Sequence, residues 1–115
     1  MSQIEKYHKN PNMWEYVRTT RLPVPNIRKL VEQENRGLDK TQALFVDMEE
    51  KQRAWEDREA EGEFELVGSL KYNIEINAPG VNKGPGLVTL GRYLGIRREE
   101  IMACGDARND WDMLK

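Results

Sequence analysis

The sequence predicts an α/β chain in two parts: an α+β part with an antiparallel sheet and helices on one face, then part of a parallel-sheet core. Two observations predict this. Up to about residue 78, apolar patterns follow one another in the order helix, strand, helix, strand, strand, which suits an antiparallel sheet covered by helices. Beyond residue 78, a loop rich in Gly and Pro is followed by leucines with helical spacing and then by a continuous apolar run. We therefore expect one part over residues 1–78 and another over residues 79–115.

The first part begins without a clear periodic pattern, and its first assignable element is a helix. That helix starts near Pro25, which is tolerated in a first turn, and is expected to end at Gly37. The apolar run 43–46 has the length of a strand. Asp47, with a glutamate three residues later, is typical of a capping box and predicts a helix over about 48–61.

Three further strands and a third helix complete the prediction. Apolar residues alternate with polar ones over 64–70 and over 72–76, which predicts two strands with one buried face each. Leucines with helical spacing over 87–94 predict a helix that ends at Gly95. The run 101–104 is typical of a strand buried on both faces of a parallel sheet, and its cysteine is expected to be an inert core residue.

The composition excludes several classes of function. The 115 residues are 38% hydrophobic and 33% charged, and the formal net charge of −2 comes from acidic and basic residues that are interspersed. Because no basic patch is present, nucleic-acid binding is not expected. The single cysteine excludes a disulfide framework and a zinc thiolate cluster. With neither a signal peptide nor an apolar run long enough to cross a bilayer, the chain is expected to be soluble and cytoplasmic.

Two places in the second part carry residues suited to phosphate chemistry. Asp106 follows the apolar run directly and Asp110 lies four residues later, so the two carboxylates are suited to hold Mg²⁺. On spacing alone, a turn residue or a helix N-cap is the favoured interpretation of such an aspartate. Lys83 lies in a Gly-rich loop just before a helix, where an ammonium and the helix dipole favour an anion, although most lysines in such loops are simply solvated.

These residues also carry a resemblance. The segment 73–84, the helix end at 93–96, the run 101–104 and the segment 105–114 resemble the third and fourth motifs of the Cof-type (subfamily IIB) phosphatases of the haloacid dehalogenase superfamily. The similarity is dense over residues 64–115 and thinner over 24–63, which resembles part of that family's cap. Two linked motifs in the right order are more specific than either one, and they favour the functional interpretation of Asp106 and Lys83.

The resemblance implies a role for each residue and a place for each part. Asp106 would bind Mg²⁺, and Asp110 would hold the metal through water or orient its neighbours. Asn109 would position the phosphate or the metal shell, and Lys83 would neutralise the phosphate and the attacking carboxylate. The first part would be the latter part of a substrate-selecting cap, and the second part a portion of a Rossmann-like core that carries the third and fourth motifs.

The nucleophile that such phosphatases use, an Asp-x-Asp segment after an early strand, has no counterpart in this chain. Asp110 and Asp112 have that spacing but lie in a helix, and Asp112 is expected to face solvent. The resemblance therefore implies an incomplete phosphoric monoester hydrolase for sugar phosphates or similar small metabolites, inactive alone. Two alternatives stay open: one subunit of a split phosphatase with a complementing N-terminal fragment, and a non-catalytic cap-derived interaction module. Unpaired sheet edges also predict self-association.

Overall fold

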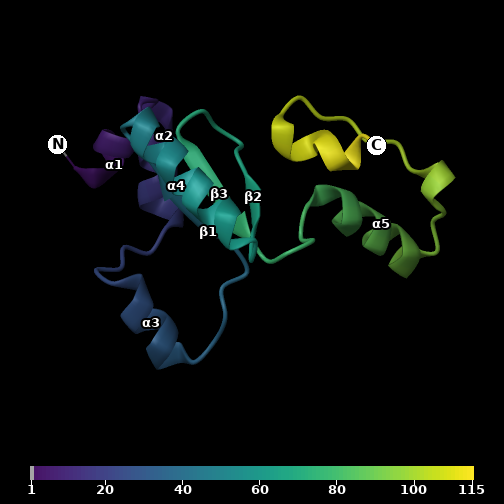
Figure 1. The fold of residues 1–115 in the computed structure, drawn as a ribbon, viewed down its shortest axis with the longest axis horizontal. Helices are drawn as coiled ribbons and strands as arrows, with labels where there is room; N and C mark the ends of the chain where they lie inside the picture. The colour runs from purple at the N-terminus through teal and green to yellow at the C-terminus, as the bar shows by residue number, and fades with distance from the viewer. Residues whose placement is uncertain (1) are drawn as a thin grey trace. The chain divides into compact units, whose positions relative to one another are not determined.

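The computed structural model describes residues 2–115, whose helices and strands are drawn in Figure 1. The contacts within the chain divide it into two compact units. The first unit ends at Leu38, and the second runs from Asp39 to Lys115. The first unit contains the helices α1 (Gln3–Tyr7), α2 (Pro11–Thr20) and α3 (Ile27–Glu34). The predicted boundary between residues 78 and 79 falls inside the second unit and remains a prediction.

Capping and polar contacts hold the first two helices, in a region where periodicity supports no assignment. The Ser2 hydroxyl accepts the Glu5 amide at 3.3 Å while the Glu5 carboxylate accepts the Ser2 amide at 3.0 Å, which forms a capping box. The indole N–H of Trp14 in α2 donates to the His8 carbonyl at 2.7 Å. An ion pair of 3.0 Å joins Arg18 in α2 to Glu5 in α1. These contacts link α1 to α2.

Helix α3 confirms the predicted helix in this region but ends earlier than expected. Asn26 caps its N-terminus by accepting the Lys29 amide at 3.1 Å. At the other end the chain leaves the helix at Asn35, whose φ of 47° lies in the left-handed region. Asparagine tolerates this conformation better than most residues, so the helix ends there and the prediction of Gly37 is wrong.

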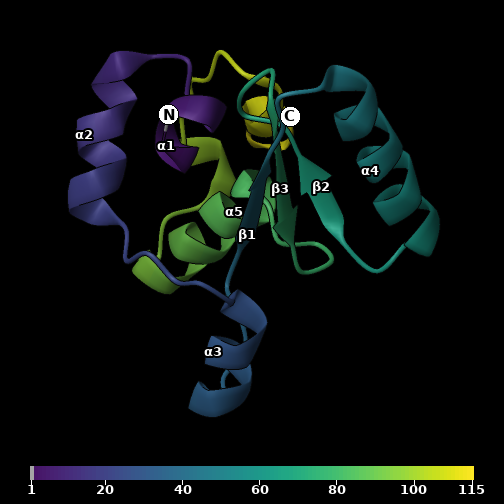
Figure 2. The same cartoon turned by 90° about the vertical axis from the view of Figure 1, so that its left-hand side faces the viewer.

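The second unit contains a three-stranded antiparallel sheet, as the sequence predicts, and the structure gives its strand order as β1-β3-β2. Its strands are β1 (Thr41–Leu44), β2 (Glu65–Val67) and β3 (Asn73–Asn77). Ile76 in the middle strand lies opposite Thr41 of β1 and opposite Leu66 of β2. Helix α4 (Met48–Glu61) follows β1 and lies beside the sheet (Figure 2). Asp47 caps α4 by accepting two amides, which confirms the predicted start.

Strand β3 is buried on both faces, whereas the alternating pattern predicted one buried face. Ile74 is 1% exposed and belongs to the apolar face, as expected. Asn73 and Glu75 point to the opposite face, and they are 0% and 7% exposed. The sequence pattern misses this burial because a polar side chain is assigned to solvent unless its partners are known.

A polar network satisfies the buried side chains of β3. The Asn73 amide accepts the Leu70 backbone N–H at 2.8 Å and donates to the Ser69 hydroxyl at 2.9 Å. The Ser69 hydroxyl donates in turn to the Glu75 carboxylate, which also forms an ion pair with Lys40. The buried side chains of Asn73 and Glu75 therefore both have partners, and the loop between β2 and β3 is held against β3.

The stability of the second unit is expected to fall in acid because of Glu75. Burial alone would raise the pKa of this carboxyl, but the hydrogen bonds from Lys40 and Ser69 and the Lys40 charge bring it below its ordinary value of 4.5. A pKa that is lower in the folded state adds stability above about 4.5, and this stability is lost as the pH falls toward the folded pKa. Thermal unfolding followed by circular dichroism between about pH 6 and about pH 3 measures the loss. Glu75→Gln should flatten the dependence, and Glu63→Gln, at an exposed site, should leave it unchanged.

The rest of the second unit consists of helix α5 (Lys83–Leu94) and the short 3-10 helices η1 (Arg98–Glu100) and η2 (Arg108–Met113). Asn82 caps α5 by accepting the Gly84 amide at 3.0 Å, so Lys83 is the first residue of the helix. Pro85 fits here because a first-turn amide has no helical acceptor. Gly95, with a φ of 72°, ends the helix as predicted.

The predicted strand over residues 101–104 does not form. The segment has no strand partner among residues 2–115, Met102 is 91% exposed, and Cys104 is exposed as well. A strand is assigned by hydrogen bonds to a neighbour, so an apolar run without one stays an unpaired segment. The prediction of a core cysteine is wrong for the same reason. None of the helices described is long and apolar enough to cross a bilayer.

Candidate active site

A turn that begins at Gly105 places Asp110 at the centre of the candidate site. Asp110 is 5% exposed, and its Oδ2 accepts the backbone N–H groups of Asp106 and Ala107, each at 3.2 Å. A Cβ added at Gly105 would lie 2.3 Å from the Asp110 Cβ and 2.7 Å from its Cγ. Only glycine therefore allows the carboxylate to lie against this turn.

Lys83 binds the other oxygen of Asp110 and brings the start of α5 into the site. Its ammonium donates to Asp110 Oδ1. This hydrogen bond, the backbone N–H of Ala107 and the Lys83 charge lower the pKa of Asp110, although desolvation opposes them. The Lys83 side chain is still 51% exposed, so its ammonium remains accessible to an anion. Residues 27 positions apart in the sequence thus form one charged pair.

Asn109 and Asp106 supply two oxygen donors without a partner. The Asn109 Oδ1 atom is buried and has no hydrogen-bond partner among the residues that the structure describes. Asp106 is exposed, and within those residues its carboxylate has no hydrogen bond or ion pair. Because a buried oxygen without a partner costs free energy, Asn109 Oδ1 is suited to receive a ligand.

Asp106 and Asn109 both line a hollow of about 740 Å³ between strand β2 and helix η2, which we call the cleft. Its polar lining also includes Asn82, whose side chain donates to Asp112 at 3.1 Å. The rest of the lining contains the charged side chains of Glu65, Arg108 and Asp112. It also contains Gly105 and a set of small, apolar or aromatic residues: Trp55, Leu66, Val67, Gly68, Ala107, Trp111 and Leu114. The volume falls in the range of small-molecule sites.

The donor set fits part of a Mg²⁺ shell. Mg²⁺ is usually held by one or two carboxylates, with substrate oxygens and waters completing an octahedron. Asp106 and Asn109 offer hard oxygens, whereas both Asp110 oxygens already bind Lys83 and backbone N–H groups. In the described chain, no group of three or more His, Cys, Asp or Glu side chains could hold a metal by itself. Of the two aspartates, Asp106 is therefore the one whose carboxylate has free oxygens for such a metal, whereas the Asp110 carboxylate is bound to Lys83 and to the backbone of its own turn.

The structure brings the predicted site residues together in two contacts. Lys83 touches Asp110, and Asp110 binds the backbone of Asp106, while Asn109 lines the same cleft as Asp106. The chemical roles of these four residues remain predictions. Sequence reasoning missed Gly105, although its place directly after the apolar run is a signal for close backbone approach.

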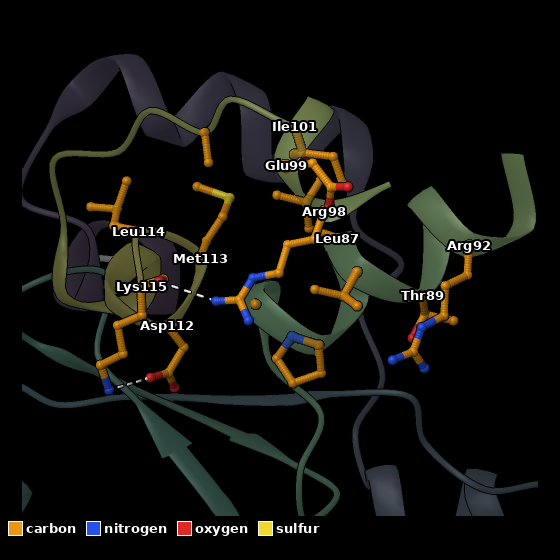
Figure 3. A pocket seen from close by; sticks show the side chains of 14 residues that line it. Leu87, Thr89, Arg92, Arg98, Glu99, Ile101, Asp112, Met113, Leu114 and Lys115 are labelled. Atoms are coloured by element: carbon orange, nitrogen blue, oxygen red, sulfur yellow. Dashed lines mark hydrogen bonds and ion pairs between the residues drawn. The ribbon is translucent and has the colours of Figure 1, made fainter. Parts of the chain in front are cut away.

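A second hollow, of about 760 Å³, lies between α5 and the C-terminal segment and contains none of the predicted site residues (Figure 3). Figure 3 shows apolar side chains such as Ile101 and Met113 beside charged ones. Arg98 donates to the Lys115 carbonyl at 3.1 Å, and the Lys115 ammonium donates to Asp112 at 2.8 Å. One ion pair, between Lys115 and Asp112, thus joins two charged groups of this lining.

Fold and site together define a mixed α/β protein in which a lysine at a helix start is paired with a carboxylate beside two free oxygen donors. The model of one family, described as haloacid dehalogenase-like hydrolase, matches residues 2–115. Since this covers all the residues that the structure describes, the chain belongs to the haloacid dehalogenase-like hydrolase family.

Relatives with curated names support the same assignment. Two are 5-amino-6-(5-phospho-D-ribitylamino)uracil phosphatases of Bacillus subtilis: YcsE is 43% identical over 53 residues, and YitU is 33% identical over 102 residues. The matches cover 46% and 84% of this chain but only 21% and 36% of those proteins. A crystal structure of a haloacid dehalogenase-like hydrolase from Bacteroides thetaiotaomicron matches with a TM-score of 0.54 and 20% identity, over 90% of this chain and 50% of that one. This last match shows the fold, and it confirms the predicted fold class.

Proposed function

We propose that this chain carries the metal-binding and phosphate-binding part of a Mg²⁺-dependent phosphatase that acts on sugar phosphates or similar small phosphorylated metabolites. The observation that carries the proposal is the group at the Gly105 turn. There Lys83 is bound to the buried Asp110, and the unpaired oxygens of Asp106 and Asn109 line one cleft. An ammonium beside hard oxygen donors is the combination that stabilises charge on a transferring phosphoryl group.

The relatives support the substrate class. YcsE and YitU are both named as phosphatases of a phosphorylated ribitylaminouracil, which is a small phosphorylated metabolite. Because this chain spans 21% and 36% of their lengths, their activity is part of the proposal rather than a property of this chain. A cytoplasmic location also remains a prediction.

Each residue of the site has a physical task in this proposal. Mg²⁺, when bound, would neutralise charge on the phosphoryl oxygens, and Asp106 and Asn109 would hold it. Asp110 keeps Lys83 at the start of α5, where the ammonium adds a second positive charge toward the phosphate. We assign no nucleophile among residues 2–115. Asp112 has the right spacing from Asp110, but it lies exposed on η2 and its carboxylate binds Asn82 and Lys115.

Asp106→Asn is expected to weaken Mg²⁺ binding by about tenfold or more, because it removes the only carboxylate proposed as a direct ligand. Isothermal titration of the purified chain with Mg²⁺ measures this. Asp57→Asn, at an exposed position on α4, is the matched control and should leave the affinity unchanged. Equal affinity in the wild type and in Asp106→Asn would contradict the proposed metal site.

The chain alone should not hydrolyse an aryl phosphate.

One observation favours a second candidate, a subunit of a split phosphatase. The apolar segment 101–104 has no strand partner among the described residues, and its Met102 is exposed. This is expected of a segment that forms a strand only when a neighbouring strand is present. A complementing N-terminal fragment or a second copy of this chain would provide such a neighbour. Both remain predictions, as does the third candidate, a cap-derived interaction module without catalysis.

A further inference from the structure

The lining of the cleft combines polar side chains with apolar and aromatic ones. Asp106, Asn109 and Asn82 line it together with apolar and aromatic side chains from both of its sides. If the polar group holds the phosphate, as the proposed function requires, the rest of the substrate lies against the apolar walls. Their chemistry then selects among substrates that share the same phosphate.

Two tryptophans stand out among the wall residues. Trp55, on α4, is half-buried and reaches the cleft from the side of the sheet, where its ring lies 4.0 Å from a Cβ built on Gly68. Trp111 is on η2, on the other side of the cleft, and is 65% exposed. A large aromatic side chain left this exposed gains stability when a ligand covers it. Most of the Trp111 side chain is therefore not covered by other residues of the described chain.

We propose that Trp55 and Trp111 select phosphate esters that carry a planar ring over those that carry an open-chain polyol. This inference rests on the proposed function and narrows its substrate class. Indole rings offer a flat apolar face to another ring, and they interact with it more strongly than their contact area alone accounts for. A flexible polyol would instead lose its bound water and its freedom of rotation against the same walls.

The charges of the cleft add a condition. Its lining contains the guanidinium of Arg108 and three carboxylates. One carboxylate, that of Asp112, is paired with Lys115, and those of Glu65 and Asp106 still outnumber the guanidinium. This balance repels a phosphate dianion, so Mg²⁺ must be present for either kind of ester to bind. The dependence of ester binding on Mg²⁺ therefore tests whether the cleft binds the phosphate. The preference for an ester with a ring tests the role of the two tryptophans.

The experiment compares phenyl phosphate with glycerol 3-phosphate, two monoesters of equal charge, by isothermal titration of the full chain in excess Mg²⁺. We expect phenyl phosphate to bind about threefold to tenfold more tightly. Trp55→Leu and Trp111→Leu should each bring the two affinities close together, whereas the Phe variants at the same positions should keep most of the preference. Quenching of tryptophan fluorescence in a Trp14→Phe background provides a second readout from the cleft residues alone.

The outcomes separate the two proposals. If neither ester binds in a Mg²⁺-dependent way, the proposed function fails. If both bind with equal affinity, or if the Leu variants keep the preference, the function stands and the role of the tryptophans is overturned. Should Trp55→Leu fail to fold, Gly68→Val replaces it. The Cβ at this position meets only ordinary contacts, the closest 3.8 Å away, so the added branches narrow the cleft and should remove the preference.

Discussion

Gly105→Ala is expected to abolish the Mg²⁺ affinity of this chain although it changes no group proposed to touch the metal. The added methyl would lie 2.3 Å from the Asp110 Cβ and 2.7 Å from its Cγ, distances that no real side chain tolerates. Asp110 must then move away from the turn. Its Oδ2 would lose the amides of Asp106 and Ala107, and Lys83 would lose its partner. Residues that orient a metal ligand typically change affinity by about tenfold to a hundredfold, and here the whole loop is displaced.

Isothermal titration with Mg²⁺ and a thermal unfolding curve together measure this effect. Gly37→Ala is the matched control, because a Cβ at Gly37 meets nothing within 4 Å. Asp110→Asn serves as a second variant. It adds no atom at the turn, and it removes the negative charge that holds Lys83 together with one of the two acceptor oxygens. Wild-type Mg²⁺ affinity in Gly105→Ala would show that the position of Asp110 does not matter for the metal.

Gly84→Ala is expected to destabilise the second unit by about 1 to 3 kcal/mol, as overpacking does in a tight contact. A Cβ at Gly84, in the first turn of α5, would lie 2.5 Å from the Asp112 carbonyl oxygen and 2.8 Å from its carbon. These are backbone atoms, so η2 itself must shift. In a unit of this size the loss should lower the melting temperature by about 4 to 8 °C per kcal/mol.

Gly86→Ala is the control for this prediction and lies in the same helix. A Cβ at Gly86 meets nothing within 4 Å, and alanine favours a helix over glycine by up to about 1 kcal/mol. The two variants add the same methyl two residues apart, and we expect them to shift the melting temperature in opposite directions. Equal melting temperatures for both would contradict a close approach of η2 to α5.

Local signals in the sequence were sufficient for most helices and strands. Asp47 predicts the start of α4 and Gly95 the end of α5, because capping depends on one side chain or one glycine and its immediate neighbours. The alternation over 64–76 predicts β2 and β3 for a similar reason. The end of α3 was missed because Asn35 adopts the left-handed conformation two residues before the glycine.

Long-range contacts decided what local signals could not. The apolar run 101–104 predicts a buried strand. A strand forms only where a neighbouring strand lies beside it, and no strand pairs with this run within the described residues. Asn73 and Glu75 read as solvent-facing, yet both are buried because Ser69 and Lys40 satisfy them. In each case the missing information is the identity of a partner.

The candidate site divides in the same way. The sequence by itself determined the family resemblance and indicated Lys83, Asp106, Asn109 and Asp110 as candidate site residues, since both follow from residue types in a fixed order. Only the tertiary structure decided that Lys83 binds Asp110, that Asn109 has an unpaired oxygen, and that two tryptophans line the cleft. The physical reason is that charge pairing, burial and close approach at a glycine depend on which segments, distant in the sequence, come into contact in space. The order of the residues alone does not give those contacts.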